Sequence, residues 1–501
     1  MNKLKRTLAL VATLAISATA FVGCGDDNNS SSSSKEDSSS SAADETSAAE
    51  GGESSTAEGE EGYTGSLKTG GDKMTILCWT PDDVNPMLEM WKGDTGYTDD
   101  QINFVNFSVG GGEAAAQYDQ YFLGGDDVDL FMVEADWALK YINDDSATAP
   151  MSELGFKDED FAGQYAYTMD IGKDSNGVIK GVSWQAAPGG WCYRTDLAEQ
   201  YLGVKTPEEM QEKVSDWDKF QATAKEVYEA SGNKTALTTT LGGIWQAFAA
   251  NRSQPWVKDD ALVIDDFCNT FIDLAKDMRD NKYVMDLNQW TDEWKAAGQT
   301  DDTMGYFVST WGFGESILLS AAGGEGGATY GKWNVCNGPT PYFWGGTWMC
   351  VSPNTDNADM VYDFIKYFTV DEASMEKYAL GKPEYVNNMN VMQKIVDEKS
   401  NSNPLLGGQD QFAVLHETAK NIDLNGLITP YDASIKQAFI DAVNAYCAGE
   451  TADAAACIED FKDRVAESVT DITVESDNII LYNVLTGWIY PSRKHVFNLI
   501  S

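Results

Sequence analysis

The sequence predicts an α/β protein of two lobes, each with a mixed, mostly parallel sheet flanked by helices. The chain has 501 residues, too many for one small hydrophobic core and enough for two lobes. It is 43% hydrophobic and 11% aromatic, which is enough apolar material to bury sizeable cores. From residue 73 onward, short apolar runs alternate with amphipathic stretches, a pattern typical of strand–helix–strand units.

This alternation can be followed along the chain. Between residues 73 and 184 the pattern predicts strands at 73–79, 101–109, 128–134 and 178–184, with a helix at 86–96. A second cycle after Gly190 predicts helices at 207–232, 265–281 and 357–369, strands at 303–311 and 342–353, and a closing helical pair at 433–449 and 453–469. Trp191 begins a strand, and Trp217 shares a helix face with Phe220 and Ala224, so we place both in the core.

Residues 1–24 predict a lipoprotein signal peptide. "MNKLKR" is positively charged, and the apolar stretch at 7–22 is short for a membrane span. The stretch ends in "FVGC", which resembles the bacterial lipobox, although Phe21 stands where Leu is usual. The resemblance implies that Cys24 becomes the lipidated first residue of the mature chain.

The segments that flank the folded part differ from it in composition. Residues 25–70 are rich in Ser, Gly and acidic residues and predict a disordered tether, because so few apolar side chains cannot bury enough surface. Residues 476–501 are apolar with a basic patch and no clear amphipathic period, and we interpret them as an atypical C-terminal extension.

The charge balance limits the possible partners. With 79 acidic and 35 basic residues the net charge is −44, which argues against nucleic acid and against charge-driven docking on anionic lipid. Eight cysteines without CxxC spacing and only two histidines predict no metal centre and no cofactor. Cys447 and Cys457 flank a short loop and are the best candidates for a disulfide.

Motifs of common enzymes are absent from the sequence. It contains no G-x-S-x-G motif, and its glycine-rich runs lack the lysine of a phosphate-binding loop. Glu134 and Asp136 follow the strand at 128–134, where they could serve as the acid pair of a glycoside hydrolase or as acceptors for sugar hydroxyls. Nothing in the sequence requires catalysis.

Tryptophans gather near predicted strand ends and helix starts. In open α/β sheets ligands bind at the carboxyl ends of strands, and the C–H faces of sugars pack on aromatic rings. Several of these tryptophans lie close to Asp, Glu or Gln, which favours a carbohydrate site. The set comprises Trp79, Trp137, Trp184, Trp245, Trp311, Trp344 and Trp348.

Over residues 72–475 the chain resembles the extracellular solute-binding proteins of ABC importers, especially the sugar-binding group that includes maltose- and multiple-sugar-binding proteins. Four segments carry the resemblance: "KMTILCW", "DDVDLFMVEADWALKYINDDSATAPMSELG", "GVIKGVSWQAAPGGWCYRTDLAEQYLG" and "GGTWMCVSPNTDNADMVYDFIKYFTVDEASMEKYAL". The sequence departs from the family at Ser183, where a proline usually precedes the crossing between lobes.

The resemblance implies a two-lobed periplasmic-binding-protein-like fold of type II with a multi-strand hinge. The first lobe would comprise 72–187 and 337–388, the second 188–336 and 389–475, with crossings near 185–190, 334–341 and 385–392. Ligand contacts would come from Trp79, Asp82, Asp83, Glu134, Asp136, Trp137, Trp184, Gln185, Trp245, Trp311, Tyr431 and Asp432, while Trp344 and Trp348 match less cleanly.

These observations together predict a lipid-anchored, monomeric binding protein on the outer face of a bacterial cell membrane. It would capture an oligosaccharide between its lobes and deliver it to the permease subunits of an ABC transporter. A peptide, polyamine or other non-sugar solute remains an alternative, as does a glycoside hydrolase that uses Glu134 and Asp136.

Overall fold

A computed structural model of the chain describes residues 63–107, 111–424 and 426–475. The predicted signal peptide, Cys24, residues 25–62 and the extension at 476–501 lie outside these residues. Residues from Tyr63 onward, which the tether was expected to include as far as 70, contact the folded part. Tyr63 packs edge-on against Tyr362, and the amide of Ser66 donates to the carbonyl of Glu153 at 2.7 Å.

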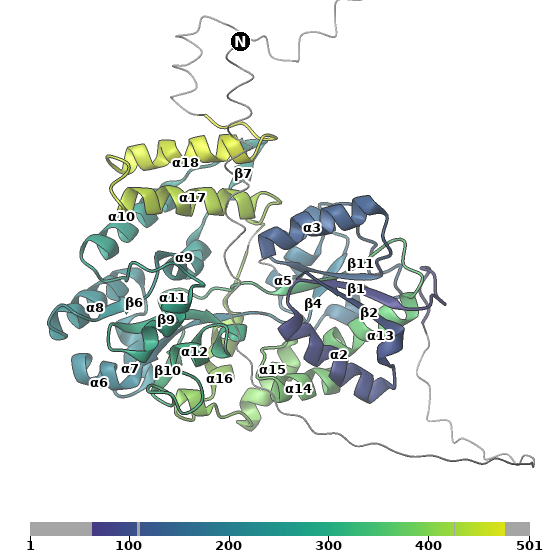
Figure 1. Ribbon diagram of the computed structural model, residues 1–501, viewed down its shortest axis with the longest axis horizontal. Coiled ribbons are helices and arrows are strands. Elements are labelled where there is room, and N and C mark those ends of the chain that lie inside the picture. Colours follow the sequence, from purple (N-terminus) through teal and green to yellow (C-terminus); the bar gives the residue numbers. More distant parts are fainter. Residues whose placement is uncertain (1–62, 108–110, 425, 476–501) are drawn as a thin grey trace, which may run out of the picture. The chain divides into compact units, whose positions relative to one another are not determined.

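The first sheet has five strands in the order β2-β1-β3-β11-β4 (Figure 1). The strands span Ile102–Asn106 (β2), Met74–Cys78 (β1), Leu130–Glu134 (β3), Thr347–Val351 (β11) and Gly181–Ser183 (β4). Strand β1 pairs in parallel with β2 and β3, whereas β11 pairs antiparallel with β3 and β4. All residues of β1 and β11 are buried, as expected for central strands covered on both faces.

The second sheet has four strands in the order β10-β5-β9-β6. They span Trp333–Cys336 (β10), Gly189–Arg194 (β5), Thr303–Ser309 (β9) and Ala236–Thr238 (β6). Strand β9 pairs in parallel with β6, and β5 pairs antiparallel with β9 and β10. A separate two-stranded hairpin joins Val257–Lys258 (β7) and Ala261–Leu262 (β8).

The sheets are mixed as expected, but they contain more antiparallel pairing than the strand–helix alternation predicts. The chain leaves the first sheet after β4, forms β5 in the second, and returns from β10 to β11. Parallel neighbours need a helical crossover within one sheet. A strand that arrives directly from the other sheet has no such constraint, so β11 and β5 can pair antiparallel.

Helices surround both sheets. The segments that form the first sheet carry α2 (Pro81–Thr95), α3 (Gly111–Gly124), α4 (Ala138–Ile142), α5 (Ala166–Gly172), α13 (Ala358–Thr369) and α14 (Glu372–Gly381). The segments around the second sheet carry α6 (Thr195–Leu202), α7 (Pro207–Lys213), α8 (Trp217–Ala230), α9 (Leu241–Phe248), α10 (Asp266–Asp280), α11 (Asp292–Ala296) and α12 (Leu318–Ala321). The helices that follow α14 are α15 (Met389–Glu398), α16 (Gln411–Ala419), α17 (Asp432–Cys447) and α18 (Ala454–Ser468).

Capping residues explain why the helix expected at 207–232 is two helices. Thr206 forms a capping box with Glu209 and starts α7, with Pro207 at the first helical position. The Asp216 carboxylate accepts from the amide of Lys219 and starts α8. These two N-cap residues lie ten residues apart and therefore divide the segment into α7 and α8.

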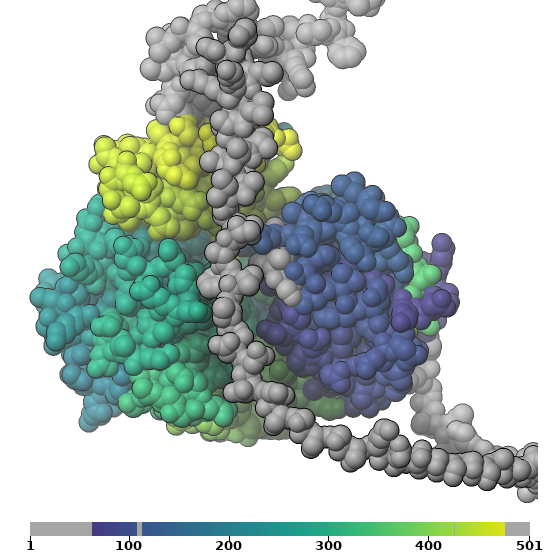
Figure 2. All heavy atoms as spheres, in the orientation of Figure 1, coloured from purple at the N-terminus to yellow at the C-terminus, as the bar shows by residue number. Residues whose placement is uncertain are grey.

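The closing helical pair forms as predicted, with α17 packed on both α18 and α10. Figure 2 shows the side chains of α17 and α18, in yellow, gathered at the surface. The disulfide expected between Cys447 and Cys457 is wrong, because both are free thiols. These cysteines lie in the packed helices α17 and α18. The buried apolar faces of the two helices hold them together without a covalent link, and the ring centroids of Phe439 and Phe461 lie 5.1 Å apart.

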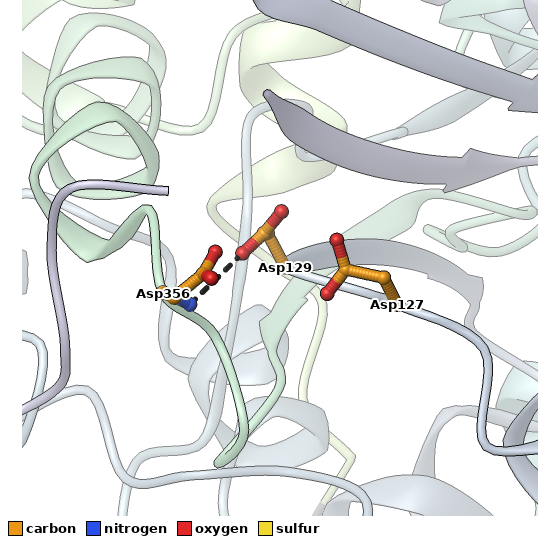
Figure 3. Close-up of side chains that lie close together, drawn as sticks. All are labelled: Asp127, Asp129 and Asp356. Carbon is orange, nitrogen blue, oxygen red and sulfur yellow. Dashed lines mark hydrogen bonds between the residues drawn. The ribbon is translucent and has the colours of Figure 1, made fainter. Parts of the chain in front are cut away.

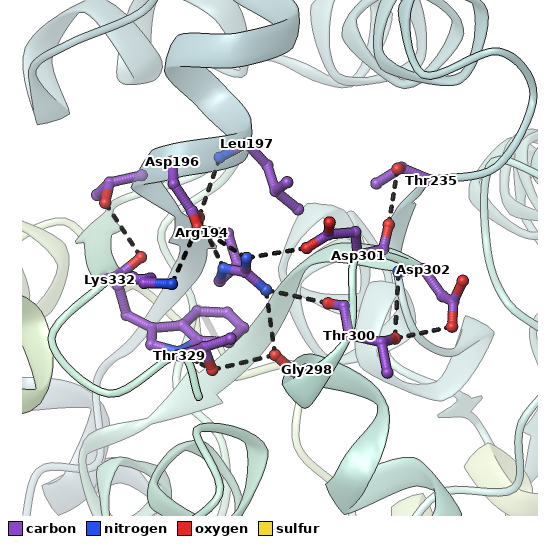
Figure 4. A network of polar contacts seen from close by, with 12 residues as sticks. Arg194, Asp196, Leu197, Thr235, Gly298, Thr300, Asp301, Asp302, Thr329 and Lys332 are labelled. Atoms are coloured by element: carbon purple, nitrogen blue, oxygen red, sulfur yellow. Dashed lines mark hydrogen bonds and ion pairs between the residues drawn. The ribbon is translucent and has the colours of Figure 1, made fainter. Parts of the chain in front are cut away.

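Arg194 anchors the end of β5 in a buried polar network (Figure 4). Its guanidinium pairs with Asp196 at 2.7 Å and Asp301 at 3.0 Å, and donates to the carbonyl oxygens of Gly298 and Thr300. The side chain is 3% exposed, and burial is tolerated because every partner is polar. The network joins β5 to the loop before β9 and helps to position the second sheet.

Candidate functional site

Three cavities in the described part of the chain are lined by the loops that follow β1, β3, β9 and β10. The first has a volume of about 770 Å³, the second about 220 Å³ and the third about 460 Å³. Each is lined by residues from two or more distant segments of the chain.

The first cavity is built around the carboxylates that follow β3. Glu134 ends the strand, and its side chain accepts from the amide of Asp136 at 2.8 Å. The Asp136 carboxylate forms an ion pair with Lys436, which α17 presents from its first turns. Trp137 forms another part of the wall and is 6% exposed. The ion pair therefore joins the loop after β3 of the first sheet to α17.

The electrostatics of this cluster are strongly perturbed. Burial raises the pKa of Glu134 to about 8, and the nearby Asp136 carboxylate adds to the rise, while Lys436 lowers it. Burial alone would lower the pKa of Lys436, but Asp136 and Glu134 outweigh it and raise that pKa. The cluster therefore holds one ion pair and one carboxyl that keeps its proton near neutral pH.

The second cavity adjoins the first, because Asp136 and Lys436 line both. Its other charged pair is Arg252 with Asp432, whose Nη2 and Oδ2 atoms lie 2.8 Å apart. Trp245 in α9 forms part of the wall and packs in an aromatic cluster with Trp256, at 6.3 Å between ring centroids. This cavity is the smallest of the three and the most aromatic.

A cluster of three tryptophans joins the second cavity to the third. Trp344 lines the second cavity and Trp311 lines the third. Their rings meet edge to face at 5.0 Å, and the Trp311 indole donates to the Trp344 carbonyl at 2.9 Å. Trp290 stacks on Trp311 at 5.9 Å and an interplanar angle of 27°, and is 51% exposed. A large indole left half in water on a packed cluster is an accessible stacking surface.

Glycines make this arrangement possible. Gly345 and Gly346 adopt φ values of 72° and 98°, a left-handed backbone that suits glycine. A Cβ on Gly345 would lie 3.1 Å from the Trp311 indole nitrogen. The two glycines therefore let the loop before β11 pass close enough to set Trp344 against Trp311.

Four carboxyls line the third cavity, and two of them, Asp83 and Glu384, come from different segments and have raised pKa values. Asp83 lies in the first turn of α2, and Glu384 follows α14. Burial raises the pKa of Glu384 to about 8, with a further contribution from Asp83. Burial also raises the pKa of Asp83. Glu384 accepts from the Tyr385 amide at 3.0 Å. Trp311 lines the same cavity, which therefore offers both hydrogen-bonding groups and an aromatic side chain.

The structure brings nine of the predicted ligand residues to the walls of these cavities. They are Asp82, Asp83 and Trp311 in the third, Glu134 and Trp137 in the first, Trp245, Trp344 and Asp432 in the second, and Asp136 in the first two. The five other predicted residues do not line any of these three cavities in the described part of the chain. They are Trp79, Trp184, Gln185, Trp348 and Tyr431.

Burial explains why several of these five lie elsewhere. Trp184 and Trp348 are each 1% exposed, and the Trp348 indole donates to the Thr168 carbonyl at 2.9 Å. Gln185 is 3% exposed and bridges to Val386 in the strand crossing. Trp79 and Tyr431 are half-buried and pack against the core.

Residues that sequence reasoning missed include Trp290, Lys436 and Glu384. Lys436 lies four residues after Asp432, a spacing that places both on one face of α17. This spacing could have identified Lys436 as a candidate site residue. Trp290 stands in a turn with φ of 74°, an unusual conformation for a bulky residue that no sequence pattern reveals.

A separate acidic cluster lies at the opposite end of β3 from Glu134. The carboxylates of Asp127, Asp129 and Asp356 lie within 4.8 Å of one another (Figure 3). The buried Asp129 accepts from the Thr75 amide at 2.7 Å and the Thr355 hydroxyl at 2.6 Å. Its oxygens are engaged by protein donors, so we assign it the role of tying β1 to the loop after β11.

Comparison with known proteins identifies the class. A family profile described as bacterial extracellular solute-binding protein matches residues 87–407, more than half of the chain. The chain therefore belongs to this family of extracellular solute-binding proteins. It is a binding protein rather than the glycoside hydrolase that the Glu134–Asp136 pair left open. A search of curated proteins found no sequence match.

Solved structures share the fold. An extracellular solute-binding protein of family 1 aligns with a TM-score of 0.67 at 17% identity, over 78% of this chain and 99% of that one. The ABC transporter associated binding protein of B. animalis subsp. lactis Bl-04, in complex with beta-1,6-galactobiose, aligns at 0.63 and 17% identity, over 79% and 97%. The Bifidobacterium longum galacto-N-biose/lacto-N-biose I-binding protein, in complex with lacto-N-biose, aligns at 0.61 and 16% identity, over 81% and 100%.

The likeness confirms the predicted fold class, the two-lobed type II periplasmic-binding-protein fold. Among the residues that the structure describes, we find no helix long and apolar enough to cross a membrane.

Proposed function

We propose that the chain captures an oligosaccharide in the three neighbouring cavities. The observation that carries the proposal is that the residues at their borders are shared or in contact. The Asp136–Lys436 pair borders the first two cavities, and the Trp344–Trp311 contact links the second to the third. Neighbouring cavities with aromatic faces and carboxylates suit several sugar rings, since rings stack on indoles and hydroxyls donate to carboxylates.

The wider role follows from the family and from the N-terminus. We propose that lipidated Cys24 anchors the protein to the outer face of the cell membrane, with the acidic segment after it as a tether. The loaded protein would deliver its sugar to the permease subunits of an ABC transporter. Ligand contacts to both lobes would favour the closed arrangement, because a ligand shifts a conformational equilibrium by its differential affinity.

Isothermal titration calorimetry against a panel of α- and β-linked oligosaccharides tests the proposal. We expect at least one to bind, and Trp311→Ala, which removes an indole from the wall of the third cavity, to weaken that binding roughly tenfold through lost stacking. Leu380→Ala is the matched control, because Leu380 is 41% exposed and lies outside the three cavities. Failure of the whole panel, together with tight binding of a peptide or polyamine, would refute the proposal.

One observation favours a second candidate, a cationic solute such as a polyamine or basic peptide. Asp83 and Glu384 are neighbouring carboxyls with raised pKa values, and a bound cation would relieve their repulsion. Affinity for such a solute would fall as salt rises, whereas affinity for a neutral sugar would stay nearly constant. Titration of spermidine at low and high salt separates the two candidates.

A further inference from the structure

Two stretches of the chain run side by side where it passes between the sheets. Residues 184–188 join β4 of the first sheet to β5 of the second, and residues 384–388 lie against them. The amide of Ala186 donates to the carbonyl of Tyr385 at 3.0 Å. We call these two stretches the linking segments. A change in the arrangement of the two sheets would bend them, because they lie between the sheets.

Three buried side chains from different parts of the fold meet at one linking segment. The hydroxyl oxygens of Tyr165 and Tyr385 lie 2.6 Å apart, and the Tyr385 hydroxyl lies 2.7 Å from Nδ1 of His416. Tyr165 precedes α5, which packs on β4 of the first sheet. His416 belongs to α16, which packs on β5 of the second sheet. Tyr385 therefore connects elements of both sheets through its hydroxyl group.

A carboxylate fixes the direction of these hydrogen bonds. The Nε2 atom of Gln393 donates to the Asp397 carboxylate at 2.9 Å, so the Gln393 Oε1 atom faces Nε2 of His416, at 3.0 Å. Because an amide oxygen only accepts, His416 carries its proton on Nε2 and its Nδ1 atom is an acceptor. Tyr385 therefore donates to His416, and Tyr165 donates to Tyr385.

Protonation of His416 is incompatible with this direction. An imidazolium donates from both nitrogens, so Tyr385 could no longer donate to Nδ1. If Tyr385 accepted instead and turned its proton toward Tyr165, the Tyr165 hydroxyl would itself need a new acceptor. Among the described residues the partners of that hydroxyl are Tyr385 and Nδ1 of His416, at 2.6 and 3.5 Å. Reversal would thus leave a buried donor without an acceptor, which is unfavourable.

The charged groups around His416 leave it neutral at pH 7. Burial lowers the pKa of His416 and Lys420 lowers it further, whereas Glu417 on the same helix and Asp397 on α15 oppose the fall. Burial raises the pKa of both tyrosine hydroxyls, which stay protonated. Glu384, in the linking segment, has a pKa raised to about 8 and keeps its proton between about pH 5 and about pH 7.

We propose that His416 is a pH-sensitive element of the link between the two sheets. While it is neutral, it accepts from Tyr385 and holds Tyr165, Tyr385 and α16 in one hydrogen-bonded chain. When it is protonated, the chain breaks at Tyr385 and the linking segments open more readily. The opened state binds one more proton, so its share rises as pH falls below the ordinary histidine pKa of about 6.5. The proposal does not depend on which ligand the cavities bind.

NMR of the full chain with isotope-labelled histidine tests the direction of the hydrogen bonds. The sequence has two histidines, His416 and His495, so a His495→Asn variant assigns the remaining signal. We expect the His416 imidazole to be neutral at about pH 7, with its proton on Nε2, and to titrate below about 6.5. A proton on Nδ1, or an imidazole still charged at that pH, would overturn the proposal.

Hydrogen exchange of residues 184–188 and 384–388 tests the consequence. After correction for the intrinsic pH dependence of amide exchange, we expect opening in the wild type to increase roughly tenfold from about pH 7 to about pH 5. His416→Asn keeps an uncharged acceptor near the position of Nδ1, so opening there should change little. Tyr385→Phe removes the link, so fast exchange should appear already at about pH 7. Tyr141→Phe is the matched control, because it removes a buried hydroxyl that donates within the first sheet's helices, and it should follow the wild type.

The outcomes distinguish a local effect from a general one. Equal pH profiles for the wild type and His416→Asn overturn the proposal, and so does a rise that is equally large in β1 and β9, which indicates general loss of stability. Should His416→Asn fail to fold, the wild type and Tyr385→Phe decide. Opening that is independent of pH in the wild type, or that rises as strongly with acid in Tyr385→Phe, overturns the proposal. None of these measurements uses a sugar, so their failure leaves the proposed carbohydrate binding intact.

Discussion

Replacement of Glu384 by glutamine should make the protein less sensitive to alkaline pH. The buried Glu384 carboxyl has a pKa raised from 4.5 to about 8, first by burial and then by Asp83. Between these two values the folded state keeps a proton that the unfolded chain has lost. The unfolded state then binds fewer protons, so the free energy of unfolding falls as pH rises toward 8.

The magnitude follows from the width of the window. One pKa unit corresponds to about 1.4 kcal/mol. Between about pH 5.5 and about pH 8, this carboxyl can therefore lower the free energy of unfolding by at most about 3 kcal/mol. Relaxation and water entry around the charged form reduce the expected value to about 2 kcal/mol. Glutamine keeps an acceptor for the Tyr385 amide, whose nitrogen lies 3.0 Å from the carboxylate in the structure. The variant therefore removes the titration without removing this contact.

Urea unfolding at about pH 5.5 and about pH 8.5 measures the effect. Across this interval, the free energy of unfolding of the wild type should fall by about 2 kcal/mol more than that of Glu384→Gln. Glu325→Gln is the control, because Glu325 lines the same cavity but is exposed, and its profile should follow the wild type. Identical pH profiles for the wild type and Glu384→Gln would refute the reasoning that burial holds this proton.

Three further substitutions have defined outcomes. Arg194→Met should lower the free energy of unfolding by about 3–5 kcal/mol, because it leaves buried acceptors without a donor, and should leave sugar affinity in calorimetry unchanged. Lys436→Met removes the cation that lowers the pKa of Glu134, so urea unfolding should show a stability loss that grows as pH rises from about 5.5 to about 8.5. Gly345→Ala places a Cβ in a left-handed conformation against Trp311 and should lower the thermal unfolding midpoint, with a stability loss of about 1–2 kcal/mol, and weaken sugar binding.

Much of the architecture could be predicted because the signals are local. Apolar runs predicted the five strands of the first sheet and β5 and β9 of the second, and helical spacing predicted α17 and α18. The short strands β6 and β10 were not predicted. The antiparallel pairing of β11 could not be read in this way, because it depends on the path of the chain between sheets. The false disulfide between Cys447 and Cys457 shows the same limit, since closeness in sequence does not determine how two helices set their side chains.

The site was harder to predict because position along a strand does not determine which way a side chain faces. Trp184 and Trp344 both lie at crossings between the sheets, yet Trp184 is sealed in the core while Trp344 borders a cavity. The difference comes from Gly345 and Gly346, which turn the later crossing toward Trp311. Trp290 joins this cluster only through tertiary packing across the fold.

The acidity of the whole chain is a poor guide to the ligand, because the cavities manage their charges locally. Each cation of the second cavity is matched to a carboxylate, Lys436 to Asp136 and Arg252 to Asp432. In these pairs each carboxylate already has a cation as its partner, which makes it less available to a cationic solute. The indoles of Trp344 and Trp311 offer apolar faces to the C–H surface of a neutral ligand, and the third cavity adds the carboxyls of Asp83 and Glu384. The net charge of −44 therefore does not by itself indicate a cationic ligand.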